Sequence, residues 1–259
     1  MIAVVGVVVA GATGAFFSDT ETSTGNTFTA GAIDLQIDNE SYVTNNEGEL
    51  VSNEDTSWAL DDLTNQLFFD FEDLKPGDVG EDTISIHVTN NDAWACMAVD
   101  ITATPENTLL EPEVDDNDVG PAQEDNGELQ NYLEFAFWHD DGDNVYEDGE
   151  EIFWEGEAGE MFNGDWQTIA DSNGDDPLPG GETVYVAKAW CFGTLTPDAE
   201  PQEEDLSPLD GTGFTCDGTG DGDQNDAQTD GVVMDVSFYA VQERNNPEFS
   251  CSSLDPLND

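Results

Sequence analysis

Basic side chains are almost absent from this chain. Its 259 residues include three Lys and Arg residues and two His residues against 60 Asp and Glu residues, for a formal net charge of −57 at pH 7. Proteins that bind nucleic acid neutralise phosphates with clustered Lys and Arg side chains. The scarcity of cations therefore excludes a nucleic-acid partner.

Catalytic signatures are missing as well. The two histidines, His87 and His139, do not belong to an H-E-x-x-H helix, whereas a catalytic zinc usually takes three protein ligands and a general base. No G-x-S-x-G nucleophile elbow occurs. Among so many acids, carboxylate pairs of the glycosidase type arise by chance. We therefore predict that the chain is not an enzyme, and we interpret both histidines as ordinary strand or surface residues.

The acidic excess indicates a salty environment. At ordinary ionic strength, self-repulsion of these carboxylates would oppose compaction. At ~1 M salt the Debye length falls to ~3 Å, so the charges are screened. A disordered acidic chain is the alternative, but 37% hydrophobic residues, with fourteen Phe and six Trp, can form a core. We expect a folded protein from a hypersaline environment.

No apolar run is long enough to remain in a membrane. Residues 2–12 are mainly Val, Ala, Ile and Gly, but the run turns polar well short of the ~20 residues that span a bilayer. Thr13, Gly14 and Ala15 place small residues where a signal peptidase cleaves. We predict that residues 1–15 are a cleaved signal peptide, that the mature protein is extracellular, and that it keeps no stable membrane span.

Only four cysteines are present, and none forms a C-x-x-C pair. Outside the cell, disulfides are the default for such residues, and four cysteines allow three pairings. We favour Cys191 with Cys216, which would close an acidic loop, and Cys96 with Cys251, which would hold the C-terminal tail. Four buried free thiols are the alternative.

Apolar residues in the ordered segments alternate with a period of two, which is typical of strands with one buried face. The predicted inward residues are Ile33, Leu35 and Ile37; Leu67, Phe69 and Phe71; Ile84, Ile86 and Val88; Met97, Val99 and Ile101; Leu133, Phe135 and Phe137; Val184 and Val186; and Val232, Met234, Val236 and Phe238.

Long polar stretches separate these strands, at 39–60, 105–128, 139–180 and 197–230. A short helix within 121–133 is the one helical candidate. Many strands with turn-rich connections favour an all-β, two-sheet sandwich with long acidic loop insertions, formed by residues 31–259 as one domain.

Residues 140–151 are the best metal candidate. Alternating oxygen ligands on a Gly-containing loop suit Ca²⁺, so we predict a calcium site formed by Asp141, Asp143, Glu147 and Glu150. Val145 departs from the EF-hand pattern, and a solvated acidic loop is the alternative. We prefer that alternative for two weaker candidate groups, which are Asp171, Asn173 and Asp175, and Asp221, Asp223 and Asn225.

The tryptophans permit two interpretations. Five of them could stack against carbohydrate, or they could belong to the core, and because they lie in different predicted strands and loops we favour the core. They are Trp94, Trp138, Trp154, Trp166 and Trp190.

Three sequence blocks together resemble the TasA/camelysin family. They are AFFSDTETSTGNTFTAGAIDLQID at the N-terminus, DLKPGD at 73–78 leading into TISIHVTNN, and DVSFYAVQ at 235–242. The resemblance implies a distinctive signal peptide handled by a SipW-type peptidase, a jelly-roll sandwich, and assembly into biofilm-matrix fibres, with relatives among archaeal bundling pili. The acidic middle of the chain matches none of these blocks.

The same resemblance implies a role for residues 16–30 as a donor strand that one subunit adds to the sheet of the next. An added strand satisfies an open sheet edge through main-chain hydrogen bonds, and head-to-tail addition builds a filament. The implied donor residues are Phe16, Phe17, Ser18, Asp19, Thr20, Thr27 and Phe28. A fold-back of the two phenylalanines onto their own domain is the alternative.

Two functions follow from the sequence. The first is a secreted structural subunit that polymerises with copies of itself into pili or biofilm fibres. The second is a monomeric, calcium-dependent cell-surface or matrix-binding β-sandwich module. Filaments in electron micrographs would distinguish the first from the second.

Overall fold

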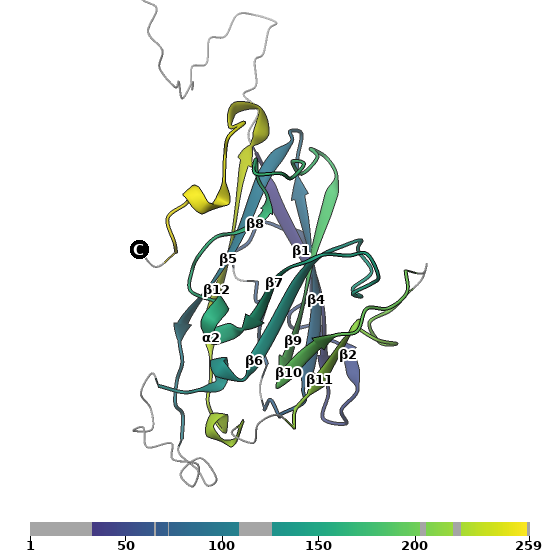
Figure 1. The fold of residues 1–259 in the computed structure, drawn as a ribbon, viewed down its shortest axis with the longest axis vertical. Coiled ribbons are helices and arrows are strands. Elements are labelled where there is room, and N and C mark those ends of the chain that lie inside the picture. The colour runs from purple at the N-terminus through teal and green to yellow at the C-terminus, as the bar shows by residue number, and fades with distance from the viewer. Residues whose placement is uncertain are drawn as a thin grey trace, which may run out of the picture. The chain divides into compact units, whose positions relative to one another are not determined.

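The computed structural model describes residues 33–64, 66–71, 73–108, 126–202, 206–219 and 224–257. The predicted signal peptide and the donor residues from Phe16 to Phe28 lie outside this part of the chain. The described residues form an all-β sandwich of antiparallel sheets, as the alternating pattern predicted (Figure 1).

The larger sheet has seven strands. Across the sheet they are β2 (Leu50–Ser52), β1 (Leu35–Thr44), β4 (Val79–Val88), β9 (Thr183–Phe192), β6 (Leu133–Asp140) and β7 (Ile152–Glu157), and β3 (Trp58–Asp61) also pairs with β1. The register sets Ile86 between Ile37 and Val184. Alternate apolar residues of neighbouring strands therefore share one face.

The smaller sheet has the order β12 (Val233–Gln242), β5 (Ala93–Ala103) and β8 (Gln167–Ala170), and β10 (Thr194–Pro197) pairs separately with β11 (Phe214–Asp217). The helical elements are short: η1 (Leu129–Asn131), α2 (Ala158–Met161), η2 (Gln224–Ala227), η3 (Glu243–Asn245) and η4 (Cys251–Ser253). The described part of 121–133 contains the turn η1 in place of the predicted helix. In the described residues no helix has the length and apolar character needed to cross a bilayer.

The main core lies between the two sheets. Ile84 and Trp190 of the larger sheet belong to the same buried cluster as Met97 and Val99 of the smaller sheet. A second cluster lies on the other face of the larger sheet, where Phe214 of β11 packs with Trp138. Both faces of β6 and β9 are therefore covered, which explains why these strands are buried along most of their length.

Several sequence predictions about strands were wrong. The stretches 139–180 and 197–230, predicted as loops, contain β8 and β11 respectively. Residues 67–71 form no strand, and the buried residue there is Phe68, 5% exposed, while Leu67 is 50% exposed. The stretch 39–60, predicted as a loop, contains most of β1, the short strand β2 and the start of β3. Polar side chains such as Asn39 and Ser41 hide these strands from a hydrophobicity pattern, although both residues are buried.

Both favoured disulfides are present. Cys96 of β5 pairs with Cys251 of η4, and Cys191 of β9 pairs with Cys216 of β11. The first bond holds the C-terminal segment against the smaller sheet. The second holds the β10–β11 hairpin against the larger sheet.

Candidate functional site

The loop between β6 and β7 folds back over the larger sheet. Gly142 and Asn144 have positive φ angles of 109° and 69°, which permit the tight turn. The Asp140 Oδ2 atom accepts a hydrogen bond from Gly142 N at 2.8 Å, and Asp143 Oδ1 accepts one from Val145 N at 3.0 Å. Val145 is completely buried, so an apolar side chain anchors the middle of this acidic loop.

Three of the four predicted calcium ligands meet in this loop. Carboxylate oxygens of Asp141, Glu147 and Glu150 lie within 4.8 Å of one another. Glu147 is fully buried, whereas Asp141 is exposed. Asp143, the fourth predicted ligand, is not in this group, and its Oδ1 atom accepts the turn hydrogen bond described above.

Glu150 holds the group together. Its two carboxylate oxygens accept hydrogen bonds from Asp141 N at 3.1 Å and Glu147 N at 2.9 Å. Burial, with smaller effects from the charges of Asp140 and Asp141, raises the pKa of Glu150 to about 7. A bound cation would relieve this accumulation of negative charge, and Ca²⁺ prefers oxygen ligands of this kind.

Gln202 also belongs to this group, although the sequence did not indicate it. Its Nε2 atom donates to Asp141 Oδ2 at 3.1 Å and to Glu147 Oε2. The backbone of Glu200 accepts from Asp148 N and donates to Tyr146 O, which joins the two segments. Gln202 is 55 positions from Glu147 in the chain, so only the tertiary structure shows that the two residues meet.

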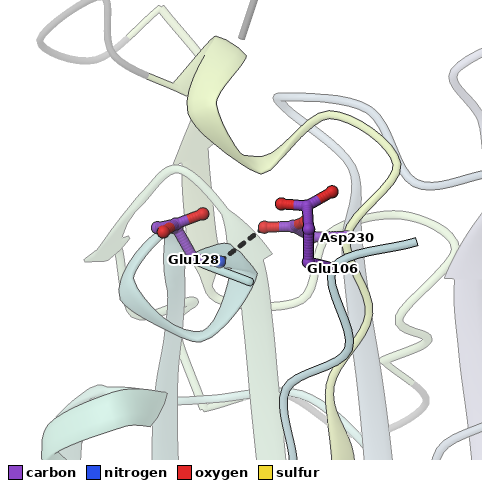
Figure 2. Close-up of side chains that lie close together, drawn as sticks. All are labelled: Glu106, Glu128 and Asp230. Carbon is purple, nitrogen blue, oxygen red and sulfur yellow. Dashed lines mark hydrogen bonds between the residues drawn. The ribbon is translucent and has the colours of Figure 1, made fainter. Parts of the chain in front are cut away.

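A second acidic group comes from three distant segments. Carboxylate oxygens of Glu106, Glu128 and Asp230 lie within 4.8 Å of one another, and Glu106 is fully buried. Figure 2 shows the three side chains converging, with Glu128 N donating to the Asp230 carboxylate. Gly231 N donates to Pro105 O at 2.9 Å, and this contact holds the end of β5 beside the start of β12. No local sequence pattern predicted this group.

The two weaker calcium candidates have different outcomes. Asp171, interpreted from the sequence as part of a solvated loop, is only 2% exposed. Burial opposes its ionisation, but hydrogen bonds from Asn173, Cys251 and Ser250 lower its pKa overall. Asp171 therefore anchors the C-terminal segment beside the Cys96–Cys251 disulfide. Asp221 and Asp223 lie outside the described residues.

The histidines form no common site. His87 Nε2 lies 3.4 Å from Asp38 Oδ2, and its Nδ1 lies 3.1 Å from Thr183 Oγ1. His139 packs against the Phe153 ring, and burial lowers the pKa of His139. Neither belongs to either acidic group.

The tryptophans pack in separate places. Trp138 and Trp190 are almost fully buried on opposite faces of the larger sheet. Trp154 stacks on Phe137, and Trp166 contacts Tyr239 of the smaller sheet. This distribution agrees with core packing and does not place the five on one face.

β12 forms one edge of the smaller sheet and is the longest edge strand in the described residues. Within the described residues, β12 pairs with β5 on one side only, over ten residues. None of its residues is fully buried, whereas residues 93–99 of β5 all are. Phe238 of β12 meets Phe68 at a ring distance of 5.8 Å, and Phe68 in turn meets Trp58 at 4.9 Å. The edges β12 and β3 therefore lie on the same side of the sandwich.

No protein-family model matches this chain, and no curated protein matches it.

Proposed function

We propose that the protein is a secreted subunit of an extracellular filament, such as a pilus or biofilm-matrix fibre of a halophilic archaeon. In this proposal residues 16–28 of one copy add as a strand to the sheet of the next copy. The observation that carries it is the edge of β12, which is ten residues long, partly apolar and without a second partner strand in the described part of the chain. The resemblance to the TasA/camelysin family supplies the expected donor.

The composition of the sheet edges favours β12 over β7 as the acceptor. Natural sheets protect exposed edges with short strands, charges and irregularities. β7 has six residues with two glutamates, and its Gly156 has a positive φ of 145°. β12 has ten residues and one charge, Asp235. An incoming strand would therefore meet less charge repulsion at β12.

Apolar side chains beside β12 favour the same choice. Val233 of β12 is 50% exposed, Leu67 beside Phe68 is 50% exposed, and Leu60 of β3 is 43% exposed. Phe16, Phe17 and Phe28 of the donor would bring apolar side chains to this side. Burial of such surface yields roughly 25 cal/mol for each Å² removed from water.

Electron microscopy of a donor deletion tests the proposal. We expect the wild-type chain to form regular filaments and a variant lacking residues 16–28 to remain a folded monomer. A chain that begins at Phe16 is the matched control and should polymerise. Filaments formed by the deletion variant would overturn the proposal.

Addition of the donor as a separate peptide distinguishes strand addition from other causes of failure. A synthetic peptide of residues 16–28 should bind the deletion variant with one peptide per chain. A peptide with Phe16, Phe17 and Phe28 replaced by Ser should bind more weakly, because its apolar anchors are gone. Equal binding by both peptides would contradict a role for the aromatic residues.

The acidic group at the β6–β7 loop favours a second candidate function, a monomeric calcium-dependent surface module. Its support is the convergence of Asp141, Glu147 and Glu150 within 4.8 Å. At a free concentration of one hundred times the Kd, calcium would stabilise the fold by about 2.7 kcal/mol. We expect chelator to lower thermal stability in high-salt buffer, and Glu150→Gln to remove this effect.

Glu155→Gln is the matched control for calcium, since Glu155 is an exposed acid of the neighbouring strand β7. It should retain the full response to chelator. If chelator leaves the wild-type melting temperature unchanged, the calcium proposal is wrong. Calcium-dependent dispersed particles without filaments would favour this second function over the first.

A further inference from the structure

Lys188 is the only one of the three basic residues that is buried. Lys75 and Arg244 are exposed, whereas Lys188 is 1% exposed at the centre of the larger sheet. It stands directly opposite Asp82 in the pairing of β9 with β4, and Asp82 is also fully buried. The Lys188 Nζ atom contacts Asp82 Oδ2.

The surroundings of this pair exclude water and orient the carboxyl group. Asn39 of β1 donates from Nδ2 to Asp82 Oδ1 at 3.1 Å and to Thr56 O at 2.7 Å. The Phe69 ring covers the amine, with Nζ 4.3 Å from the ring centroid. Asp82 is therefore held between an amide donor on one oxygen and an amine on the other.

A buried ion pair by itself adds little to the stability of a fold. Desolvation of two buried charges often costs as much as their attraction provides, and an apolar pair of similar volume is frequently as stable. The amine and the carboxyl group, held in contact in a fully buried site, are set for condensation.

We propose that Lys188 and Asp82 form a side-chain amide cross-link. The Lys188 ammonium passes one proton to Asp82 Oδ2, the Nζ lone pair so freed attacks Asp82 Cγ, and the Asn39 amide stabilises the negative charge that develops on Oδ1. The new C–N bond forms as the bond from Cγ to Oδ2 breaks, and a proton from Nζ leaves with that oxygen as water. The ammonium and carboxylate become one neutral amide and one water, so no oxidant or co-reactant is required.

The cross-link would join β4 and β9 in the middle of the larger sheet, between residues 106 positions apart. Neither residue belongs to the acidic groups or to the β12 edge. The proposal is therefore independent of filament formation and of calcium.

Peptide mapping of the reduced wild-type protein by mass spectrometry tests the proposal. We expect the peptides containing Asp82 and Lys188 to appear as one branched species, lighter by one water than the two together. The exposed pair Lys75 and Asp73, whose atoms Nζ and Oδ2 are 2.8 Å apart, is an internal control and should remain unlinked because water reaches it. Separate, unmodified Asp82 and Lys188 peptides would overturn the proposal.

Variants define the chemistry. Lys188→Met should yield only the unbranched peptides. Asn39→Ala should slow cross-link formation after refolding by about a hundredfold, as loss of an oxyanion donor does elsewhere. Branching that persists in Lys188→Met would assign the link to another residue, and an unchanged rate in Asn39→Ala would contradict the proposed role of Asn39. The wild-type map decides the main question even if a variant fails to fold.

Discussion

On the side of β7, the chain crosses directly from the larger sheet to the smaller one, whereas on the side of β12 a segment that forms no strand lies between β12 and β3, which are edge strands in the described part of the chain. The crossing is made by α2 and Phe162, and Phe162 O accepts from Ile101 N of β5 at 3.1 Å. Phe162, 3% exposed, packs against Phe135 and Trp154. We call these the closed side and the open side.

On the open side, residues 66–71 lie between the sheets without joining either. Phe68 contacts Phe238 of the smaller sheet, while Phe69 and Phe71 contact Phe135 and Trp190 of the larger sheet. This segment covers the core but satisfies no strand edge. In the described residues, the aromatic segment of the open side therefore fills the core without pairing with β12, whereas on the closed side Phe162 pairs with Ile101 of β5.

Matched substitutions on the two sides should give the largest effect. We expect Phe162→Ala on the closed side to lower the free energy of unfolding by about 4 kcal/mol, because a fully buried ring leaves a cavity. Phe238→Ala on the open side should cost about 2 kcal/mol, since its ring is only partly buried. Denaturant unfolding in high salt measures both. Equal losses would show that the two sides are equally well packed.

Amide hydrogen exchange tests whether β12 or β7 is the edge that accepts the donor strand. In filaments, the amides of β12 should exchange at least about tenfold more slowly than in the deletion monomer, because an added strand protects them. The amides of β7 should be unchanged and serve as the control. Protection of β7 instead would move the acceptor edge to the closed side.

The pH dependence should give the smallest effect, and it concerns the larger sheet under the β6–β7 loop. Glu81 is fully buried, and burial, followed by the charges of Asp82 and Asp140, raises its pKa well above the usual value. The folded state therefore holds a proton that the unfolded chain releases. The stability from this group is fully present below the unfolded pKa and is lost as pH rises through the higher folded pKa.

Glu81→Gln tests this sign, because glutamine keeps an oxygen acceptor for Asn144 Nδ2, which donates to Glu81 Oε2 at 3.2 Å. Relative to the wild type, the variant should gain stability as pH rises from acidic to neutral. Glu155→Gln, at an exposed position, should follow the wild-type curve. A wild-type protein that instead loses stability on acidification in parallel with the Glu81→Gln variant would contradict the assignment.

Much of the fold could be predicted from the sequence because strands with one buried face alternate. Ile84, Ile86 and Val88 are buried as expected, and the β12 pattern was found in the right place. The prediction of a strand at residues 67–71 was wrong. The apolar residues alternate there as well as in the true strands, but no neighbouring strand pairs with this segment. Alternation indicates two faces, but only a partner provides the hydrogen bonds of a strand.

The candidate site residues were also predicted only in part. Asp141, Glu147 and Glu150 belong to one loop, so their spacing in the chain was sufficient to predict that they meet. Gln202 and the group of Glu106, Glu128 and Asp230 were not predicted, because their members are distant in sequence and carry no shared motif.

Composition and period-two patterns are local properties, so they are sufficient to predict a cation-poor, acidic, strand-rich chain with two favoured disulfides. Tertiary structure decided which sheet edges remain open and which charges become partners. Lys188 and Asp82 are one lysine and one of sixty acids in the sequence, and only the register of β9 against β4 makes them neighbours in a fully buried site.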